Sequence, residues 1–359
     1  FLAAWRLGGA LGLTDAERCM MVLAVAASPV YRGTLNWSAQ PMLSFISASI
    51  AVPLGVFALA AAFEDRVVVA LVSAALAFDV HPSLGLCAGV GALIVLLNSR
   101  GWRAVLPGLA AATIVALPNV VYILRHASSA TAESNQRLVT VFQSFGYHTF
   151  VRDHWKDGYT WYSLCVALAF VGAAKIPLPT GRAARLAVTI LTLVAVSWIA
   201  VMNLTPFAGA LPLLLVRASL LVKPLAIGLA VVAVTRRDYS NVAAVLAPVF
   251  AMLAIAHPNP VVGEAALAAT LGAVLFDSSG GVRRAVAVTI CCCSAGLFLV
   301  VVAGHVTVLA GVASLSSPVR LLTLAVGAGT SVLLALGGSP AATQQGGRYQ
   351  RTILLAALA

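Results

Sequence analysis

Charged residues are scarce in this sequence. They make up 9% of its 359 residues, whereas hydrophobic residues make up 61% and the mean hydropathy is +1.00. Soluble domains carry about 25% charged residues, so this chain has too little polar surface for a water-soluble globule. The deficit runs along the whole chain, which excludes a cytosolic enzyme, a disordered regulator and a receptor with one membrane anchor. The composition predicts a protein embedded in a lipid bilayer.

Acidic residues and nucleotide-binding motifs are also lacking. There are 11 Asp and Glu against 22 Lys and Arg, but the basic residues occupy short gaps between apolar runs, where they set membrane topology. We therefore expect no nucleic-acid partner. The six cysteines lie in apolar stretches without a CxxC pair, as expected of small membrane-embedded residues. The sequence contains no phosphate-binding loop with a Walker lysine and no HExxH, which makes ATP-driven transport by this chain alone unexpected.

Apolar runs dominate the sequence. About twelve are long enough to be membrane segments, allowing for tilted and broken helices; they are residues 19–30, 42–63, 67–79, 83–97, 104–124, 161–174, 186–202, 218–234, 242–256, 261–276, 285–303 and 320–337. The pattern predicts an all-α, polytopic helical bundle of about 11–12 membrane segments. We expect N-terminal helices over 1–124, an extracytoplasmic loop over 125–160 and C-terminal helices over 161–359. Because the chain starts at Phe1, further segments are expected upstream.

The gaps between the runs alternate in charge. One set of gaps holds mostly basic residues when taken together, and the positive-inside rule makes this set cytoplasmic; it comprises residues 64–66, 98–103, 175–185, 236–238 and 277–284. Histidines follow the opposite pattern, because His81, His126, His148, His154 and His257 all fall in the other gaps, and His305 lies just past a segment that runs outward. This distribution favours a working face outside the cytoplasm.

The segment around Asp79 and His81 interrupts an otherwise apolar stretch. Ionisable groups at this depth are costly, so each is a candidate for function. Pro82 predicts a tight outer turn after His81. Asp79 either caps the next helix or faces a substrate together with His81, and the two roles are compatible. Gly85 and Gly89 have the spacing of close helix contacts.

The long loop carries a second group of ionisable residues, His148, Asp153 and His154, followed by Asp157. Two carboxylates and two imidazoles are suited to acid–base chemistry, to substrate contact or to holding a divalent cation. A solvated, charged helix explains the same residues, and their spacing matches no stringent metal motif. A cofactor is therefore not specified by the sequence.

Two cations lie at a membrane entry in the C-terminal half. Arg217 and Lys223 suit the phosphate of a lipid carrier, although snorkelling to the headgroups explains them as well. Six residues of regular helix would keep them apart, and Pro224 is expected to open the helix there. Glu264 and His257 are expected near the same outer cavity, and a buried, protonated Glu264 is an alternative.

The order of these features resembles the multi-pass membrane glycosyltransferases of the C superfamily. The resemblance covers roughly Leu11 to Val234 and rests on residues 24–66 and 67–100: a helix ending in Ser-Pro, an outer polar loop, a helix, a short charged turn, and a helix pair split at the outer face by His81-Pro82. It implies sugar transfer from a polyprenyl-phosphate sugar to a glycan or lipid acceptor, outside a bacterial plasma membrane. The family's acidic residue of the first outer loop has no counterpart before Tyr31.

Three functions are compatible with this reading. In the first, Asp79, His81, His148, Asp153 and His154 line an outward cavity for sugar transfer, while Arg217, Lys223, Glu264 and His257 contact substrate. In the second, the chain is a structural subunit that binds other membrane subunits. In the third it is a transporter or flippase, although no inverted repeat or paired broken helices are evident.

Overall fold

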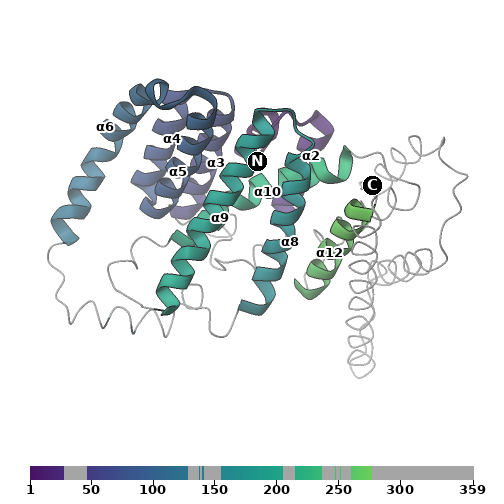
Figure 1. Ribbon diagram of the computed structural model, residues 1–359. Helices are drawn as coiled ribbons and strands as arrows, with labels where there is room; N and C mark the ends of the chain where they lie inside the picture. Colours follow the sequence, from purple (N-terminus) through teal and green to yellow (C-terminus); the bar gives the residue numbers. More distant parts are fainter. Residues whose placement is uncertain are drawn as a thin grey trace, which may run out of the picture. The chain divides into compact units, whose positions relative to one another are not determined.

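The computed structural model describes five stretches of the chain. These are residues 1–27, 47–127, 155–204, 215–236 and 260–276, together with the single positions 137, 140, 247 and 251. The chain divides into two compact units, Phe1–Ala233 and Val234–Ala359. Most described residues belong to the first unit (Figure 1).

Every regular element in the described stretches is helical. In chain order they are α1 (Leu2–Ala10), α2 (Asp15–Ala27), α3 (Ser47–Phe63), α4 (Val67–Val80), α5 (Pro82–Arg100), α6 (Trp102–Ala127), α8 (Trp155–Ala173), α9 (Thr180–Leu204), the 3-10 turn η3 (Leu215–Arg217), α10 (Ala218–Thr235) and α12 (Pro260–Phe276). The predicted all-α class is thus confirmed for the described part of the chain.

Four of these helices are long and apolar enough to cross a membrane: Pro82–Arg100, Trp102–Arg125, Thr180–Trp198 and Leu215–Thr235. A helix satisfies most of its backbone hydrogen bonds internally, which suits a lipid environment. Shorter apolar helices cover Ser49–Phe63, Val67–Val80 and Leu164–Ala173. A helical membrane protein is the class that these helices define.

Helix α10 is the most enclosed of the four. Of its apolar window 89% is buried, compared with 11% for α6. Glycines mark the places where neighbours approach it: Gly55 of α3 faces Leu221, and Gly172 of α8 faces the backbone of Leu229. Close approach at small residues is the usual way in which membrane helices gain packing contacts. Helix α10 therefore forms the core of the first unit.

The first two helices form a hairpin with a reciprocal cap. The backbone N–H of Thr14 donates to the Glu17 carboxylate at 2.8 Å, and the backbone N–H of Glu17 donates to the Thr14 hydroxyl at 3.4 Å. This capping box satisfies N–H groups that the first turn of α2 leaves free. The side chain of Arg18 adds a hydrogen bond to the carbonyl of Leu13. Helix α1 was not expected from the sequence, because its nine residues are too short for a span.

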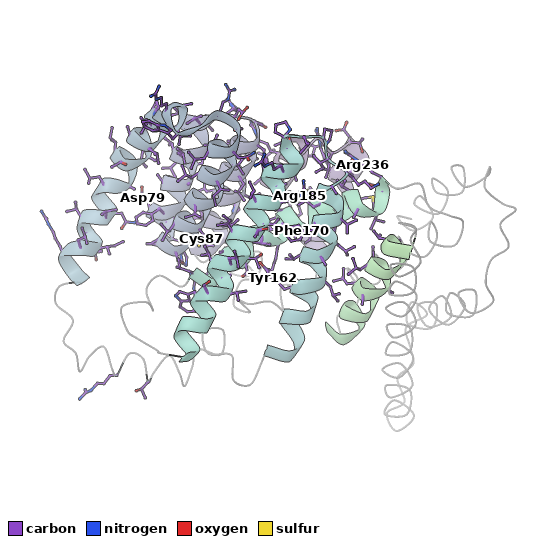
Figure 2. All side chains as sticks on the ribbon, viewed as in Figure 1. Asp79, Cys87, Tyr162, Phe170, Arg185 and Arg236 are labelled. Carbon is purple, nitrogen blue, oxygen red and sulfur yellow. The ribbon has the colours of Figure 1, made fainter. Side chains whose placement is uncertain are left out.

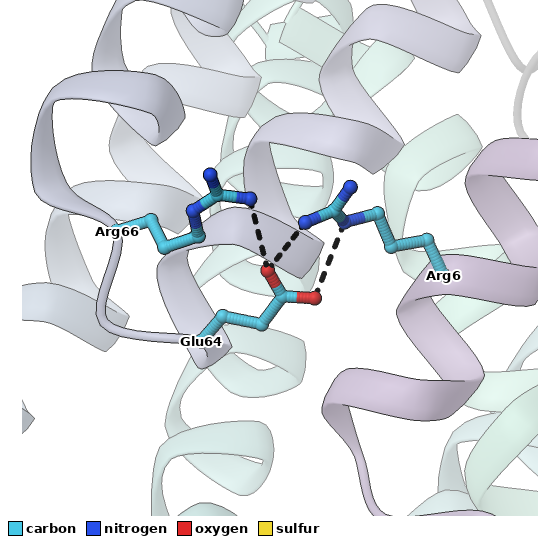
Figure 3. A network of polar contacts seen from close by, with 3 residues as sticks. All are labelled: Arg6, Glu64 and Arg66. Carbon is cyan, nitrogen blue, oxygen red and sulfur yellow. Dashed lines mark hydrogen bonds and ion pairs between the residues drawn. The ribbon is translucent and has the colours of Figure 1, made fainter.

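One end of the bundle is tied by ion pairs. Arg6 of α1 binds Glu64 through two N–H groups, at 3.2 and 2.8 Å, and Arg66 lies 3.8 Å from the same carboxylate (Figure 3). Beside them Arg100 lies 3.2 Å from Asp65. The α3–α4 turn and the α5–α6 turn therefore lie at one end, as the charge pattern predicts.

Candidate functional site

The candidate site lies at the opposite end of α4 and α5, where the chain reverses at His81. Helix α4 ends at Val80, His81 has an extended backbone with φ −152°, and Pro82 begins α5. Proline suits a first helical position because its missing N–H needs no partner there. Gly85 lies directly against the backbone of Phe78, and Gly89 faces Ala74 at 3.9 Å. The expected turn at His81-Pro82 and the expected close packing at Gly85 are confirmed, whereas the contact at Gly89 is an ordinary van der Waals contact.

Arg217 reaches this turn from another part of the sequence. It ends η3, which packs on both α5 and α9. An N–H of its guanidinium lies 3.5 Å from Nδ1 of His81, and the hydroxyl of Ser83 lies 3.1 Å from the same nitrogen. The sulfur of Cys87 lies 4.0 Å from the carbonyl of Leu215, which links α5 to η3 a turn further along. Residues 136 positions apart thus form one polar cluster, which we call the His81–Arg217 cluster (His81, Ser83, Arg217).

The cluster holds His81 as a neutral ring. Burial first, and the positive charge of Arg217 second, lower the pKa of His81 from 6.5 to about 4. Because a guanidinium can only donate, Nδ1 must accept, and the ring proton belongs on Nε2. The cluster therefore presents one positive charge, on Arg217, beside a neutral imidazole.

An anion is the chemical complement of this arrangement. Arg217 is half-buried, and its planar guanidinium has five N–H donors, of which the bond to His81 uses one. Such a fork binds phosphate or carboxylate through two parallel hydrogen bonds, and partial burial strengthens the attraction. The Nε2–H of His81 is a further donor. The predicted role of Arg217 as an anion ligand is chemically consistent with its position.

Lys223 lies deeper than Arg217. It is one of the most buried side chains of the described residues, with 1% exposure, and six residues of helix place it about 9 Å further along the axis. It interacts electrostatically with Cys165. Near Cys165 on α8, the hydroxyl of Tyr162 lies 2.9 Å from that of Thr192. Lys223 is therefore close to α8, the helix on which Figure 2 labels Tyr162.

The expected opening of the helix at Pro224 is wrong. Helix α10 continues through Pro224 to Thr235. A proline inside a helix costs about 3 kcal/mol because the carbonyl four residues earlier loses its donor. Here residues 218–229 are all buried, and their packing offsets that loss.

Asp79 does not cap α5. It lies in the last turn of α4, its side chain is exposed, and the N-cap residue of α5 is His81, which makes no side-chain cap hydrogen bond. The cap interpretation is therefore wrong. The extended residue His81 separates the two helices, so Asp79 belongs to the end of α4 and not to the start of α5. In the described part of the chain, the hydrogen bonds of the His81 ring go to Ser83 and Arg217 and not to Asp79.

Several predicted site residues lie outside the described stretches, namely His148, Asp153, His154 and His257. Glu264 is in α12 of the second unit. Among described residues, no group of three or more His, Cys, Asp or Glu side chains is placed to hold a metal ion. The acid–base and cation hypotheses for the long loop stay predictions.

Two residues of the site were not singled out from the sequence. Ser83 contacts His81, and Asn119 of α6 donates through its amide to the carbonyls of Phe78, at 3.2 Å, and Asp79, at 3.5 Å. The signal for Asn119 was available, because it is a strongly polar side chain in the apolar run 104–124. The carbonyl groups that Asn119 contacts could not be predicted from the sequence, since they depend on how α6 packs on α4.

Comparison with known proteins found no match among family models, curated proteins or solved structures. The function must therefore be inferred from the membrane helices and from the His81–Arg217 cluster.

Proposed function

We propose that this chain is an integral membrane glycosyltransferase of the polyprenyl-phosphate-sugar type. It would cross a bacterial plasma membrane about 11–12 times, with the His81–Arg217 cluster at the extracytoplasmic end and the ion-paired turns at Glu64 and Arg100 in the cytoplasm. The orientation is supported by the positive-inside rule, because the turns at 64–66 and 98–103, which lie together at the second of these ends, belong to the set of gaps that is mostly basic. The observation that carries the proposal is the 3.5 Å contact between Arg217 and His81.

The proposed chemistry needs a cation where negative charge develops. When an acceptor hydroxyl attacks the anomeric carbon, the bond from that carbon to the phosphate oxygen breaks and the phosphate leaves with the electron pair. Arg217 would bind this phosphate, and the Nε2–H of His81 would donate to it. Preorganised donors of this kind are commonly the largest contribution to catalysis.

The proton of the acceptor hydroxyl also needs a destination. Among the described carboxylates Asp79 is the nearest to His81 along the chain, and its side chain is exposed at the end of α4. We assign it the role of general base, which suits a carboxylate in contact with the acceptor. His81 is less suited to this role because its Nδ1 already accepts hydrogen bonds.

Transfer and binding by purified protein in lipid nanodiscs test the proposal. Polyprenyl-phosphate sugars with a labelled sugar are offered, and both bound and transferred label are counted. Arg217→Ala should abolish binding, whereas Arg217→Lys should retain part of it, because lysine keeps the charge without the fork. Asp79→Asn should bind the donor and fail to transfer.

Arg185→Ala is the matched control. Arg185 is an exposed arginine near the beginning of α9, so its loss should leave both binding and transfer intact. If the unsubstituted protein neither binds nor transfers label from any of the donors, the proposal is refuted. Donor-independent flux of a solute into proteoliposomes, lost in Asp79→Asn, would instead favour a transporter, and co-purification with other membrane proteins at fixed stoichiometry would favour a structural subunit.

A further inference from the structure

Helix α4 has a backbone carbonyl that Pro82 leaves without its usual donor. In an α-helix the carbonyl of Phe78 would accept the N–H of the residue four positions later. That residue is Pro82, which has no N–H. An unsatisfied carbonyl in an apolar environment costs free energy, and in a membrane there is little water to replace the donor.

Asn119 supplies the missing donor from a different helix. Its side-chain amide lies 3.2 Å from the carbonyl of Phe78 and 3.5 Å from that of Asp79, the two residues that precede the turn. The side chain is half-buried and follows Pro118, which lies inside α6. One amide therefore holds both carbonyls at the end of α4.

The turn that Asn119 holds is the one that presents His81. The position of this turn also depends on Gly85 of α5. Because glycine has no side chain, α5 can lie directly against the backbone of Phe78. With both constraints in place, Nδ1 of His81 lies within reach of Arg217 and Ser83. Loss of the amide would free the end of α4 and with it the ring of His81.

We propose that Asn119 is a positioning residue for the anion site, which acts through the α4–α5 turn and sets how tightly Arg217 and His81 together hold a phosphate. The role in phosphate binding rests on the proposed function, whereas the positioning of His81 does not. Helix α6, of whose apolar window only 11% is buried, would thereby connect the lipid-facing side of the bundle to the site.

The first measurement needs no ligand. In protein with labelled histidine, the imidazole resonance of His81, assigned with His81→Asn, reports the environment of the ring. Asn119→Asp keeps the size of the side chain but removes its donor, and Asn119→Ala removes it altogether. Both should move the resonance and bring the pKa of His81 from about 4 toward its ordinary value, since the ring becomes more hydrated. The charged and titratable groups next to it are Arg217 of η3 and, two residues earlier, Asp79.

The second measurement uses farnesyl phosphate as the probe. Its dissociation constant should rise about threefold to tenfold in Asn119→Asp and Asn119→Ala, the range that one hydrogen bond supports. Asn119→Gln keeps an amide donor and should retain most of the binding. Thr113→Ala is the matched control, because it removes a side-chain hydrogen bond on α6 that ends within that helix, at the carbonyl of Leu109.

The two measurements separate the two ideas. An unchanged His81 resonance in folded Asn119→Asp and Asn119→Ala overturns the positioning role of Asn119. A shifted resonance together with the expected loss of farnesyl phosphate binding supports this role. It is also supported if Asn119→Gln has a His81 resonance and a dissociation constant between those of Asn119→Asp and of the unsubstituted protein. If the unsubstituted protein does not bind farnesyl phosphate, the proposed function fails, and the His81 resonance alone decides the role of Asn119.

Discussion

Two glycines on one face of α5 should respond oppositely to the same substitution. Gly85 and Gly89 both face α4, four residues apart. A methyl group at Gly85 would overlap the backbone N and Cα of Phe78, which cannot rotate away. A methyl group at Gly89 would meet only the Cβ of Ala74, at 3.9 Å, an ordinary van der Waals contact.

These contacts set the expected magnitudes. Alanine is favoured over glycine in a helix by about 1 kcal/mol, so Gly89→Ala should raise the free energy of unfolding by up to about that amount. Overpacking costs about 1–3 kcal/mol, and the backbone contact places Gly85→Ala at the upper end of this range. We therefore expect Gly85→Ala to lower stability by about 2 kcal/mol, giving a difference of about 2–3 kcal/mol between the variants.

Unfolding in mixed micelles by titration with a denaturing detergent, followed by near-UV circular dichroism, measures both free energies. Gly85→Ala should also separate the α4–α5 turn from η3, so the His81 resonance should shift in this variant and stay in place in Gly89→Ala. Equal stabilities for the two variants would refute the inference that backbone contact at Phe78 determines the packing of this hairpin.

Three further outcomes follow from the polar contacts. Because the pKa of His81 is lowered from 6.5 to about 4, the unfolded chain binds a proton that the folded chain does not as pH falls through this window. Stability should therefore be full above about pH 6.5 and decrease toward pH 4; detergent unfolding at several pH values should show this slope, and an equal slope in His81→Asn would contradict it. Thr14→Ala removes the cap shared with Glu17 and should cost about 1 kcal/mol; faster amide hydrogen exchange in the first turn of α2 reports it, and unchanged exchange would argue against the cap. Glu64→Gln loses the ion pair with Arg6, so its thermal destabilisation should be larger in low salt than in high salt; salt-independent destabilisation would show that charge is not the cause.

Local sequence features predicted much of the first unit. The apolar runs located α3, α4, α5, α6, α9 and α10, because a membrane helix must be apolar over most of its length. His81-Pro82 located the turn between α4 and α5, because proline ends one helix and suits the start of the next. The charge pattern placed the turns at Asp65 and Arg100 at the same end, where an ion pair of 3.2 Å now joins them.

Pairwise relations across the bundle were not accessible in the same way. Arg217 was predicted to be an anion ligand and His81 to be a site residue, but nothing in their surroundings in the sequence indicates that they meet. Pro224 was expected to open α10, since a local rule for proline does not include the burial that keeps this helix intact. For Asp79 a capping role and a substrate-facing role were both left open, and the first does not hold because His81 is the N-cap residue of α5.

Composition and the apolar runs, being properties of the chain itself, determined that this is a helical membrane protein and where several of its helices begin and end. Tertiary packing decided which polar groups share a site, because the contacts of Arg217 with His81 and of Asn119 with Phe78 join helices far apart in sequence. Those contacts depend on how closely helices approach, and that distance is set by single side chains such as the missing one at Gly85.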